Sequence, residues 1–178
     1  MKVWSHFKTI TYHKYLVAKG CFKIGLYRQG ILHDLSKYSP TEFIVGAKYY
    51  QGTRSPNNAE REVIGYSSAW LHHKGRNRHH YEYWIDYNWK GELIPCPMPD
   101  KYLAELIMDR IAASKVYEGK NYTDASALAY YNNRGSRENE YIHEKTKAQI
   151  EMLLTMLAEK GEKETYSYIR RELLGKKA

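Results

Sequence analysis

The chain has 178 residues, enough for one domain with its own hydrophobic core. Hydrophobic residues make up 43% and charged residues 27%, which is typical of a soluble globular protein, and no apolar run reaches the ~18 residues of a membrane span. We therefore expect no membrane partner. The net charge of +8 favours polyanions such as nucleotides, nucleic acid or phosphorylated metabolites, although many basic proteins have no such partner.

The N-terminal region mixes lysines and histidines with apolar residues and has no continuous apolar stretch. We therefore predict no signal peptide and a cytoplasmic location. The two cysteines, Cys21 and Cys96, form no CxxC motif, and in a reducing compartment we expect both to stay unpaired.

Helical periodicity dominates the chain, and no run of residues is convincing as a long strand. The sequence therefore predicts an all-α bundle of about seven helices, forming a single domain over residues 1–178. The expected helical segments are 4–19, 22–35, 40–50, 57–73, 101–117, 123–131, 138–160 and 163–174.

Local signals mark several ends of these helices. Ser39 can cap the helix that begins at Pro40, and Glu42 completes a capping box. Gly20 and Gly119 are expected to end helices. Residues 87–99 contain three prolines and a glycine, which predicts a loop or a short hairpin around residues 88–91.

The adjacent residues His33 and Asp34 are bracketed by apolar neighbours, so at least one of these polar side chains faces inward. Burying an unpaired carboxylate is costly, and a metal removes that cost. Adjacent residues on a helix point about 100° apart, so both can bind one metal only close to the helix surface. The alternative is an ordinary Asp at a helix end beside a surface His.

Asp109 lies on or beside the apolar side of a later helix, where a carboxylate requires a cation. That cation is either a metal or an arginine such as Arg28 or Arg61. The first helix offers His6 and His13, which share a face, and His13 lies closer to the apolar side.

The segment LHHKGRNRHH, residues 71–80, holds four histidines and three basic residues. Metals require neutral imidazoles and phosphates require cationic donors, and this segment supplies both. The alternative is a solvated basic loop that binds either nucleic acid or no partner. Flanking Trp and Tyr residues are expected to anchor the segment to the core, which favours a functional site that includes His72, His73, His79 and His80.

In chain order, His13, the pair His33-Asp34, the histidine cluster and Asp109 resemble the HD-domain superfamily of metal-dependent phosphohydrolases. The run HDLSK resembles the HDxxK form, in which the lysine lies near the substrate phosphate. The stretches HDLSKYSPTEF and HHKGRNRHHYEYW also resemble a small family of bacterial and phage proteins with no established activity. The resemblance covers roughly residues 6–117, whereas residues 123–174 carry none of it and are expected to be packing helices, a partner surface or a lid.

The resemblance implies one or two divalent transition metals, of the kind Mn, Fe, Zn, Co or Ni. One would be held by His13, His33, Asp34 and Asp109, and Asp34 would bridge to a second held by histidines of the cluster. A metal-activated water would attack the phosphorus of a nucleotide or other phosphoester. Asp34 and Lys37 would be catalytic, and Lys37, Arg76 and Arg78 would steady the phosphate charge.

Several alternatives stay open at the level of sequence. The first ligand is His6 or His13, the cluster ligand is His72 or His73, and one or both of His79 and His80 bind. The same scaffold also suits a di-iron oxygenase. A basic helical module that binds nucleic acid without catalysis is the third reading.

Overall fold

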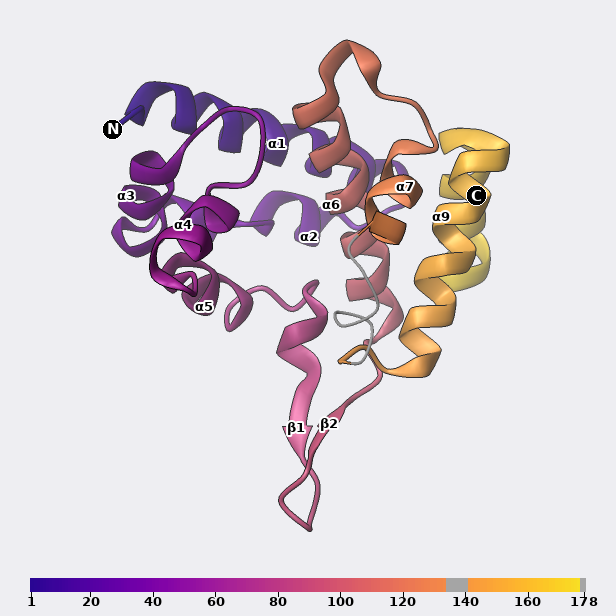
Figure 1. Ribbon diagram of the computed structural model, residues 1–178. Helices are drawn as coiled ribbons and strands as arrows, with labels where there is room; N and C mark the ends of the chain where they lie inside the picture. Colours follow the sequence, from indigo (N-terminus) through magenta and orange to yellow (C-terminus); the bar gives the residue numbers. More distant parts are fainter. Residues whose placement is uncertain (134–140, 177–178) are drawn as a thin grey trace.

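The computed structural model describes residues 1–133 and 141–176 (Figure 1). Over these residues the protein is all-α, as predicted, with eight α-helices and one small hairpin. The helices are α1 (Val3–Lys23), α2 (Tyr27–Leu32), α3 (Pro40–Tyr49), α4 (Pro56–Ile64), α5 (Ser68–Lys74), α6 (Asp100–Glu118), α7 (Ser126–Asn133) and α9 (Glu144–Tyr168). Short 3-10 turns cover Leu35–Tyr38, Tyr81–Trp84 and Gly119–Asn121, and a π-helical turn covers Ile169–Leu173.

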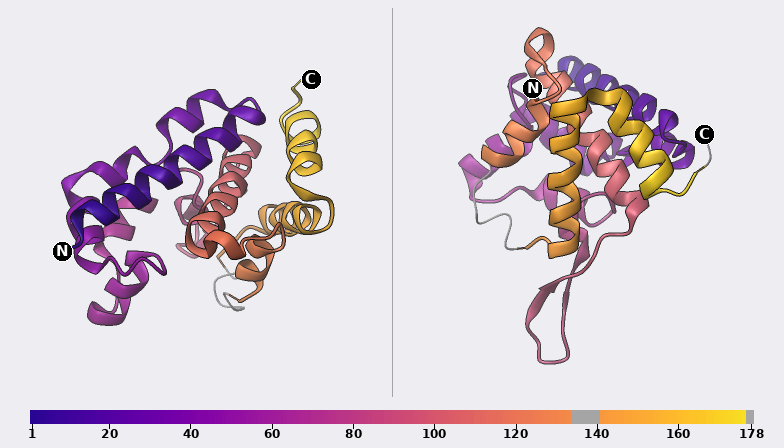
Figure 2. Two further views of the ribbon diagram at one scale, coloured as in Figure 1. Left: turned by 90° about the horizontal axis from the view of Figure 1, so that it is seen from above. Right: turned by 90° about the vertical axis from the view of Figure 1, so that its right-hand side faces the viewer.

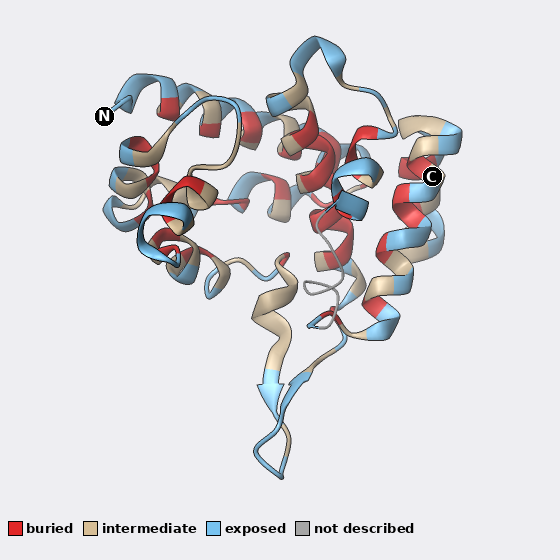
Figure 3. Cartoon of the chain, viewed as in Figure 1, coloured by how far each residue is buried: buried red, intermediate tan, exposed pale blue. Residues whose placement is uncertain are grey.

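Helix α6 is the central helix of the fold and packs against α1, α7 and α9. Figure 3 shows buried residues along much of its length, whereas α1 buries only the side that faces the other helices. Because α6 is covered on several sides, both apolar and polar residues of this helix are buried. Its apolar residues join a core that includes Leu103, Ile107, Met108, Ile150, Leu153, Leu154 and Leu157.

The prediction that Gly20 ends the first helix was wrong, because α1 continues to Lys23. Gly20 is buried inside α1, where an added Cβ would lie 2.7 Å from Sδ of Met108. The glycine therefore permits the close approach of α1 to α6. This approach positions the inner face of α1 against the part of α6 that carries Asp109.

Two predicted helices are broken by glycines in the left-handed region. The predicted helix 22–35 is interrupted at Gly25 (φ 76°), and α2 ends at Leu32. The predicted helix 57–73 is divided at Gly65 (φ 84°) into α4 and α5. A residue without a Cβ adopts this backbone conformation at little cost, which makes it a frequent end of a helix.

The predicted hairpin around residues 88–91 is present, formed by β1 (Ile85–Tyr87) and β2 (Leu93–Pro95). The two strands are antiparallel, with Asp86 opposite Ile94, and Figure 1 shows the hairpin projecting from the helical body. Cys21 and Cys96 are both free thiols, as expected. Among the described residues, no helix has the length and apolar character required to cross a bilayer.

The C-terminal helices differ from prediction at their ends. Residues 134–140, which include the predicted helix start at 138, lie outside the described residues. Helix α9 joins most of the two predicted C-terminal helices, and it kinks at Gly161 (φ 78°, ψ 175°) between them. Figure 2 shows α9 and the residues after the kink on one side of α6.

Candidate metal centre

His33 and Asp34 lie just after the end of α2, not within a helix. The backbone of His33 is extended (φ −50°, ψ 127°), and Asp34 adopts the left-handed conformation with φ 53°. Asp34 is the only described non-glycine residue with positive φ. The 100° separation expected on a helix therefore does not apply, and both side chains, each 2% exposed, reach the same buried site.

One group of potential ligands joins α1, the end of α2 and α6. Asp109 Oδ1 lies 2.9 Å from His13 Nε2 and 3.4 Å from His33 Nε2. Asp34 Oδ2 lies 3.3 Å from His33 Nε2 and 3.9 Å from His13 Nε2. These two imidazoles and two carboxylates have ligand atoms within 4.8 Å of one another, so the group can hold a metal ion.

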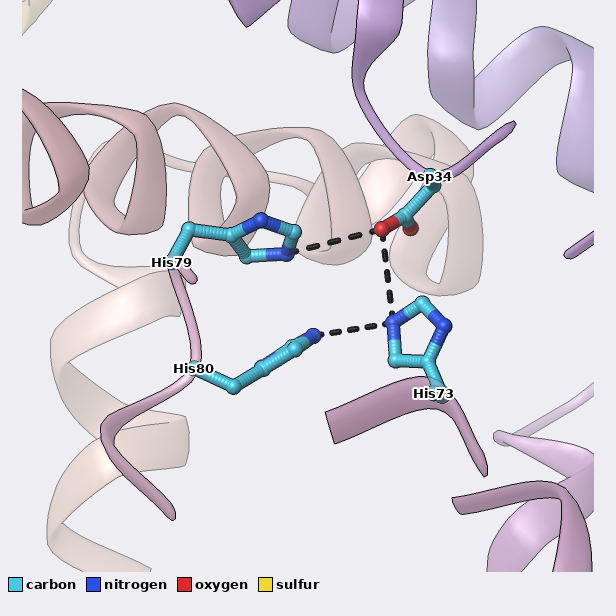
Figure 4. A group of neighbouring side chains, drawn as sticks. All are labelled: Asp34, His73, His79 and His80. Atoms are coloured by element: carbon cyan, nitrogen blue, oxygen red, sulfur yellow. Dashed lines mark hydrogen bonds and ion pairs between the residues drawn. The ribbon is translucent and has the colours of Figure 1, made fainter. Parts of the chain in front are cut away.

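A second group joins Asp34 to the histidines of residues 73–80 (Figure 4). Asp34 Oδ1 lies 3.3 Å from His73 Nε2 and 3.5 Å from His79 Nε2. His80 Nε2 lies 2.9 Å from His73 Nε2. Helix α5 carries His73, whereas His79 and His80 follow in the loop after it. This group can also hold a metal ion, and its ligand atoms likewise lie within 4.8 Å of one another.

Asp34 is shared by the two groups, and its two carboxylate oxygens are divided between them. Oδ2 faces His13 and His33, and Oδ1 faces His73 and His79. A carboxylate in this position can bridge two metal ions, one on each oxygen.

Two glutamates orient the imidazoles from behind. Glu105 Oε1 accepts a hydrogen bond of 2.9 Å from Nδ1 of His33 and lies 3.2 Å from Nδ1 of His79. Glu42 Oε2 accepts a hydrogen bond of 2.8 Å from Nδ1 of His73. A carboxylate only accepts hydrogen bonds, so each of these imidazoles carries a proton on Nδ1, and its other nitrogen, Nε2, faces the ligand groups around Asp34.

The ligand atoms are buried without the hydrogen bonds that such atoms normally require. Within the described residues, His33 Nε2, His79 Nε2 and Asp34 Oδ1 have no hydrogen-bond partner, whereas Asp34 Oδ2 is paired with Lys37 Nζ at 2.6 Å. Unsatisfied buried polar atoms are costly, and three of them converge here. Their nitrogen and oxygen chemistry and their convergence fit a bound transition metal.

The charges of the site shift its pKa values in opposite directions. Burial raises the pKa of Asp34 and of Asp109, but the neighbouring imidazoles, with Lys37 beside Asp34, hold both pKa values well below the usual range. Burial lowers the pKa of His33, yet the two aspartates raise it well above the ordinary value. For His80 burial dominates, and its pKa lies well below the ordinary value. Both aspartates are therefore ionised at neutral pH and require positive charge nearby.

For two of the alternatives left open by the sequence, only one of the two histidines lies in a group of potential ligands. His13 lies in the first group, whereas His6 packs against Phe43 and Tyr50, outside both groups. His73 lies in the second group, whereas Nδ1 of its neighbour His72 contacts Glu42 Oε1 at 2.6 Å and takes no part in a group.

Of the three residues predicted to bind phosphate, only one lies at the site. Lys37 lies beside Asp34 and lines the adjoining pocket. Arg76 and Arg78 are exposed and do not line that pocket. Arg76 donates to the backbone oxygen of His72, and Arg78 donates to the hydroxyl of Tyr102. In this segment His79 is buried and His80 is half-buried, whereas the two arginines stay on the surface.

The sequence predictions missed Glu42 and Glu105. Glu42 was assigned to a capping box, but Ser39 makes no capping hydrogen bond and Glu42 binds His72 and His73 instead. Glu105 lies four residues before Asp109 on α6, so the two share a face. A second carboxylate on that apolar helix face was a signal in the sequence for a polar site.

A pocket of about 410 Å³ adjoins both ligand groups. Its walls include His13 and Asp109 from the first group, His73 and His80 from the second, and Lys37. A volume of this order suits a small organic ligand, for which pockets of roughly 300–1,000 Å³ are usual. The arrangement can therefore bring a small molecule into contact with both candidate metal positions.

Comparison with known proteins identifies the family but no activity. A family model described as a family of unknown function (DUF5662) matches residues 2–156, and the chain belongs to this family. No curated protein and no solved structure matches the chain.

Proposed function

We propose that this member of a family of unknown function is a metal-dependent phosphohydrolase that cleaves a nucleotide or another phosphoester. The observation that supports this most is the position of Asp34, whose two carboxylate oxygens face two different sets of imidazole nitrogens. A carboxylate shared between two ions is the arrangement of two-metal hydrolytic centres. The resemblance of the ordered ligands to the HD-domain superfamily supports the same reaction class.

The first metal would be held by His13, His33, Asp34 and Asp109, and the second by Asp34, His73, His79 and His80. Mixed imidazole and carboxylate ligands suit Mn, Fe, Zn, Co or Ni. When bound, such metals polarise a phosphoryl oxygen and lower the pKa of a water so that it can act as a nucleophile.

The residues of the chain would supply orientation and charge. Glu105 and Glu42 keep the imidazole Nε2 atoms directed at the ligand positions, which maintains metal affinity. Lys37 lines the pocket beside Asp34, where its ammonium group would contact a phosphate oxygen next to the metals. Asp34 and Lys37 are thus the residues closest to the reacting phosphate in this proposal.

The test combines elemental analysis of the purified full-length protein with a hydrolysis assay on a panel of nucleotides and other phosphoesters. We expect two transition-metal ions per chain and hydrolysis of at least one phosphoester. His73→Ala should lose one metal and most of the activity. His72→Ala is the matched control, because the adjacent imidazole touches Glu42 but neither ligand group, and it should keep both metals.

Three outcomes would contradict the proposal. Equal loss of metal in the His72 and His73 variants would show that the second group is not a metal site. Iron together with oxygen consumption and no hydrolysis would indicate an oxygenase. A protein that takes up no metal and hydrolyses nothing on the panel would be a binding module.

A further inference from the structure

The outer face of α1 takes no part in the proposed metal centre. Helix α1 buries one side, which includes His6, Ile10, His13 and Val17. On the opposite side, residues spaced three or four apart form a single row along the helix. This row, the α1 stripe, consists of Trp4, Lys8, Tyr12, Tyr15, Lys19 and Phe22.

The aromatic side chains of the α1 stripe are exposed to an unusual degree. The exposed fractions are 65% for Trp4, 53% for Tyr12, 58% for Tyr15 and 42% for Phe22. The rings of Tyr12 and Tyr15 are stacked, with centroids 6.5 Å apart, and Lys8 Nζ lies 5.3 Å from the centre of the Trp4 ring. Figure 2 shows α1 running along the outside of the molecule, in keeping with the exposed fractions of these residues. Exposed apolar surface of this kind marks interaction sites.

The charge that α1 itself carries is of one sign. No Asp or Glu precedes Asp34 in the chain. The same segment contains the basic residues Lys2, Lys8, Lys14, Lys19, Lys23 and Arg28. A helix face with cations and no carboxylates of its own is complementary to a polyanion.

The composition of the α1 stripe distinguishes between two polyanions, a membrane surface and a single-stranded nucleic acid. Its apolar members are all aromatic, and the exposed aliphatic residues nearby in the chain, Val3 at the start of α1 and Ile31 and Leu32 of α2, are not members of it. A helix that lies in a membrane surface buries a face that includes aliphatic side chains. Aromatic rings alternating with lysines instead match the bases and phosphates of a single strand, since every base can stack on a ring.

We propose that the α1 stripe binds single-stranded nucleic acid, with bases stacked on the rings and phosphates held by Lys8 and Lys19. From Trp4 to Phe22 the stripe is about 27 Å long, at ~1.5 Å per residue. That length accommodates several nucleotides. The surface lies on the opposite side of α1 from His13, so this binding does not depend on the proposed hydrolysis.

Binding of fluorescein-labelled 12-nucleotide oligouridylate and oligothymidylate to the full-length protein tests the proposal by fluorescence anisotropy at several salt concentrations. Lys8→Glu with Lys19→Glu should weaken binding about tenfold or more and reduce its salt dependence. Lys145→Glu with Lys160→Glu makes the same charge change at exposed positions on α9 and should weaken binding less than about threefold. Trp4→Ala should weaken binding about tenfold. Trp89→Ala, at an exposed Trp of the hairpin, should leave binding unchanged.

Circular dichroism and metal content of each variant separate a loss of binding from a loss of fold, because substitutions on an exposed face should alter neither. Equal losses in the stripe and control variants would overturn the proposal and indicate a non-specific effect of net charge. Absence of oligonucleotide binding at low salt would also overturn it. So would binding of vesicles of phosphatidylglycerol and phosphatidylcholine without binding of the oligonucleotides, which would indicate a membrane surface instead.

Discussion

Helix α6 contributes to two buried regions that differ in what stabilises them. In the candidate metal centre, Glu105 and Asp109 are surrounded by imidazoles, and several of the atoms there lack hydrogen bonds. In the apolar core, Ile107 of the same helix shares a cluster with Leu153 and Leu157 of α9. Burial stabilises the second region directly, whereas the first gains stability only when a cation compensates its carboxylates. In this fold, burial therefore stabilises the apolar core directly, whereas in the candidate metal centre it gathers charged groups that a bound cation would compensate.

The largest expected effect comes from removing the shared carboxylate. Asp34→Ala should abolish binding of at least one metal and lower the rate of phosphoester hydrolysis by about 1,000-fold or more, since the bridging ligand is lost. The metal-free variant should also unfold at a lower temperature than the metal-free wild type, because Lys37 and the imidazole of His33 lose the carboxylate that balances their charge. Metal analysis, hydrolysis assays and thermal denaturation after chelation measure these effects.

Leu153→Ala in the apolar core is the variant to compare with Asp34→Ala in the candidate metal centre. It should lower the free energy of unfolding by about 2–5 kcal/mol through lost burial and a cavity, yet the folded variant should keep its metals. Chemical denaturation measures the free energy of unfolding, and elemental analysis measures the metal content. A core variant that lost metal as readily as Asp34→Ala would show that the two regions are not energetically separate.

An intermediate effect is expected from Glu105, which contacts Nδ1 of both His33 and His79. Glu105→Gln should weaken metal affinity about 10- to 100-fold, because the imidazoles lose the partner that orients them. The control is Glu60→Gln, a buried carboxylate that accepts hydrogen bonds from Ser67 and Ser68. Glu60→Gln should lower the free energy of unfolding and leave metal affinity unaltered. If Glu60→Gln weakened metal binding and Glu105→Gln did not, Glu105 would not orient the metal ligands.

The pH dependence of metal binding is expected to be a graded effect, about tenfold for each pH unit. The pKa of His33 is raised, so its imidazole keeps a proton at pH values where an exposed imidazole has lost it. Metal binding requires release of that proton, so affinity should increase as pH rises through the raised pKa and fall below it, by about tenfold per pH unit for each proton displaced. Competition titrations with a chelator between about pH 6 and pH 8 measure the slope. The effect of Leu153→Ala on metal-free stability should not change over this range, and a pH-independent metal affinity would contradict the assignment of His33.

The ligand types were predictable from sequence because buried histidines and aspartates are rare and stand out against an apolar background. The sequence could not choose between His72 and His73, since the choice depends on which side of α5 faces Asp34. Glu42 was misassigned because a local pattern, the capping box, competed with a tertiary contact. The hairpin and the helix end at Gly119 followed from local turn chemistry, whereas the breaks at Gly25 and Gly65 lie inside stretches whose apolar periodicity continues past the glycine.

The pairing of α1 with α6 has a consequence for how the protein is made. His13 and Asp109 are in contact but 96 residues apart in the chain, so the first ligand group cannot close until α6 has left the ribosome. Until then the emerging segment displays its histidines without the carboxylates of α6, and any ion that it collects is held by a partial and exchangeable set of ligands. In the proposed metal centre, commitment to a particular metal would therefore be deferred to the late, long-range step of folding, when loop closure and metal capture would become one event.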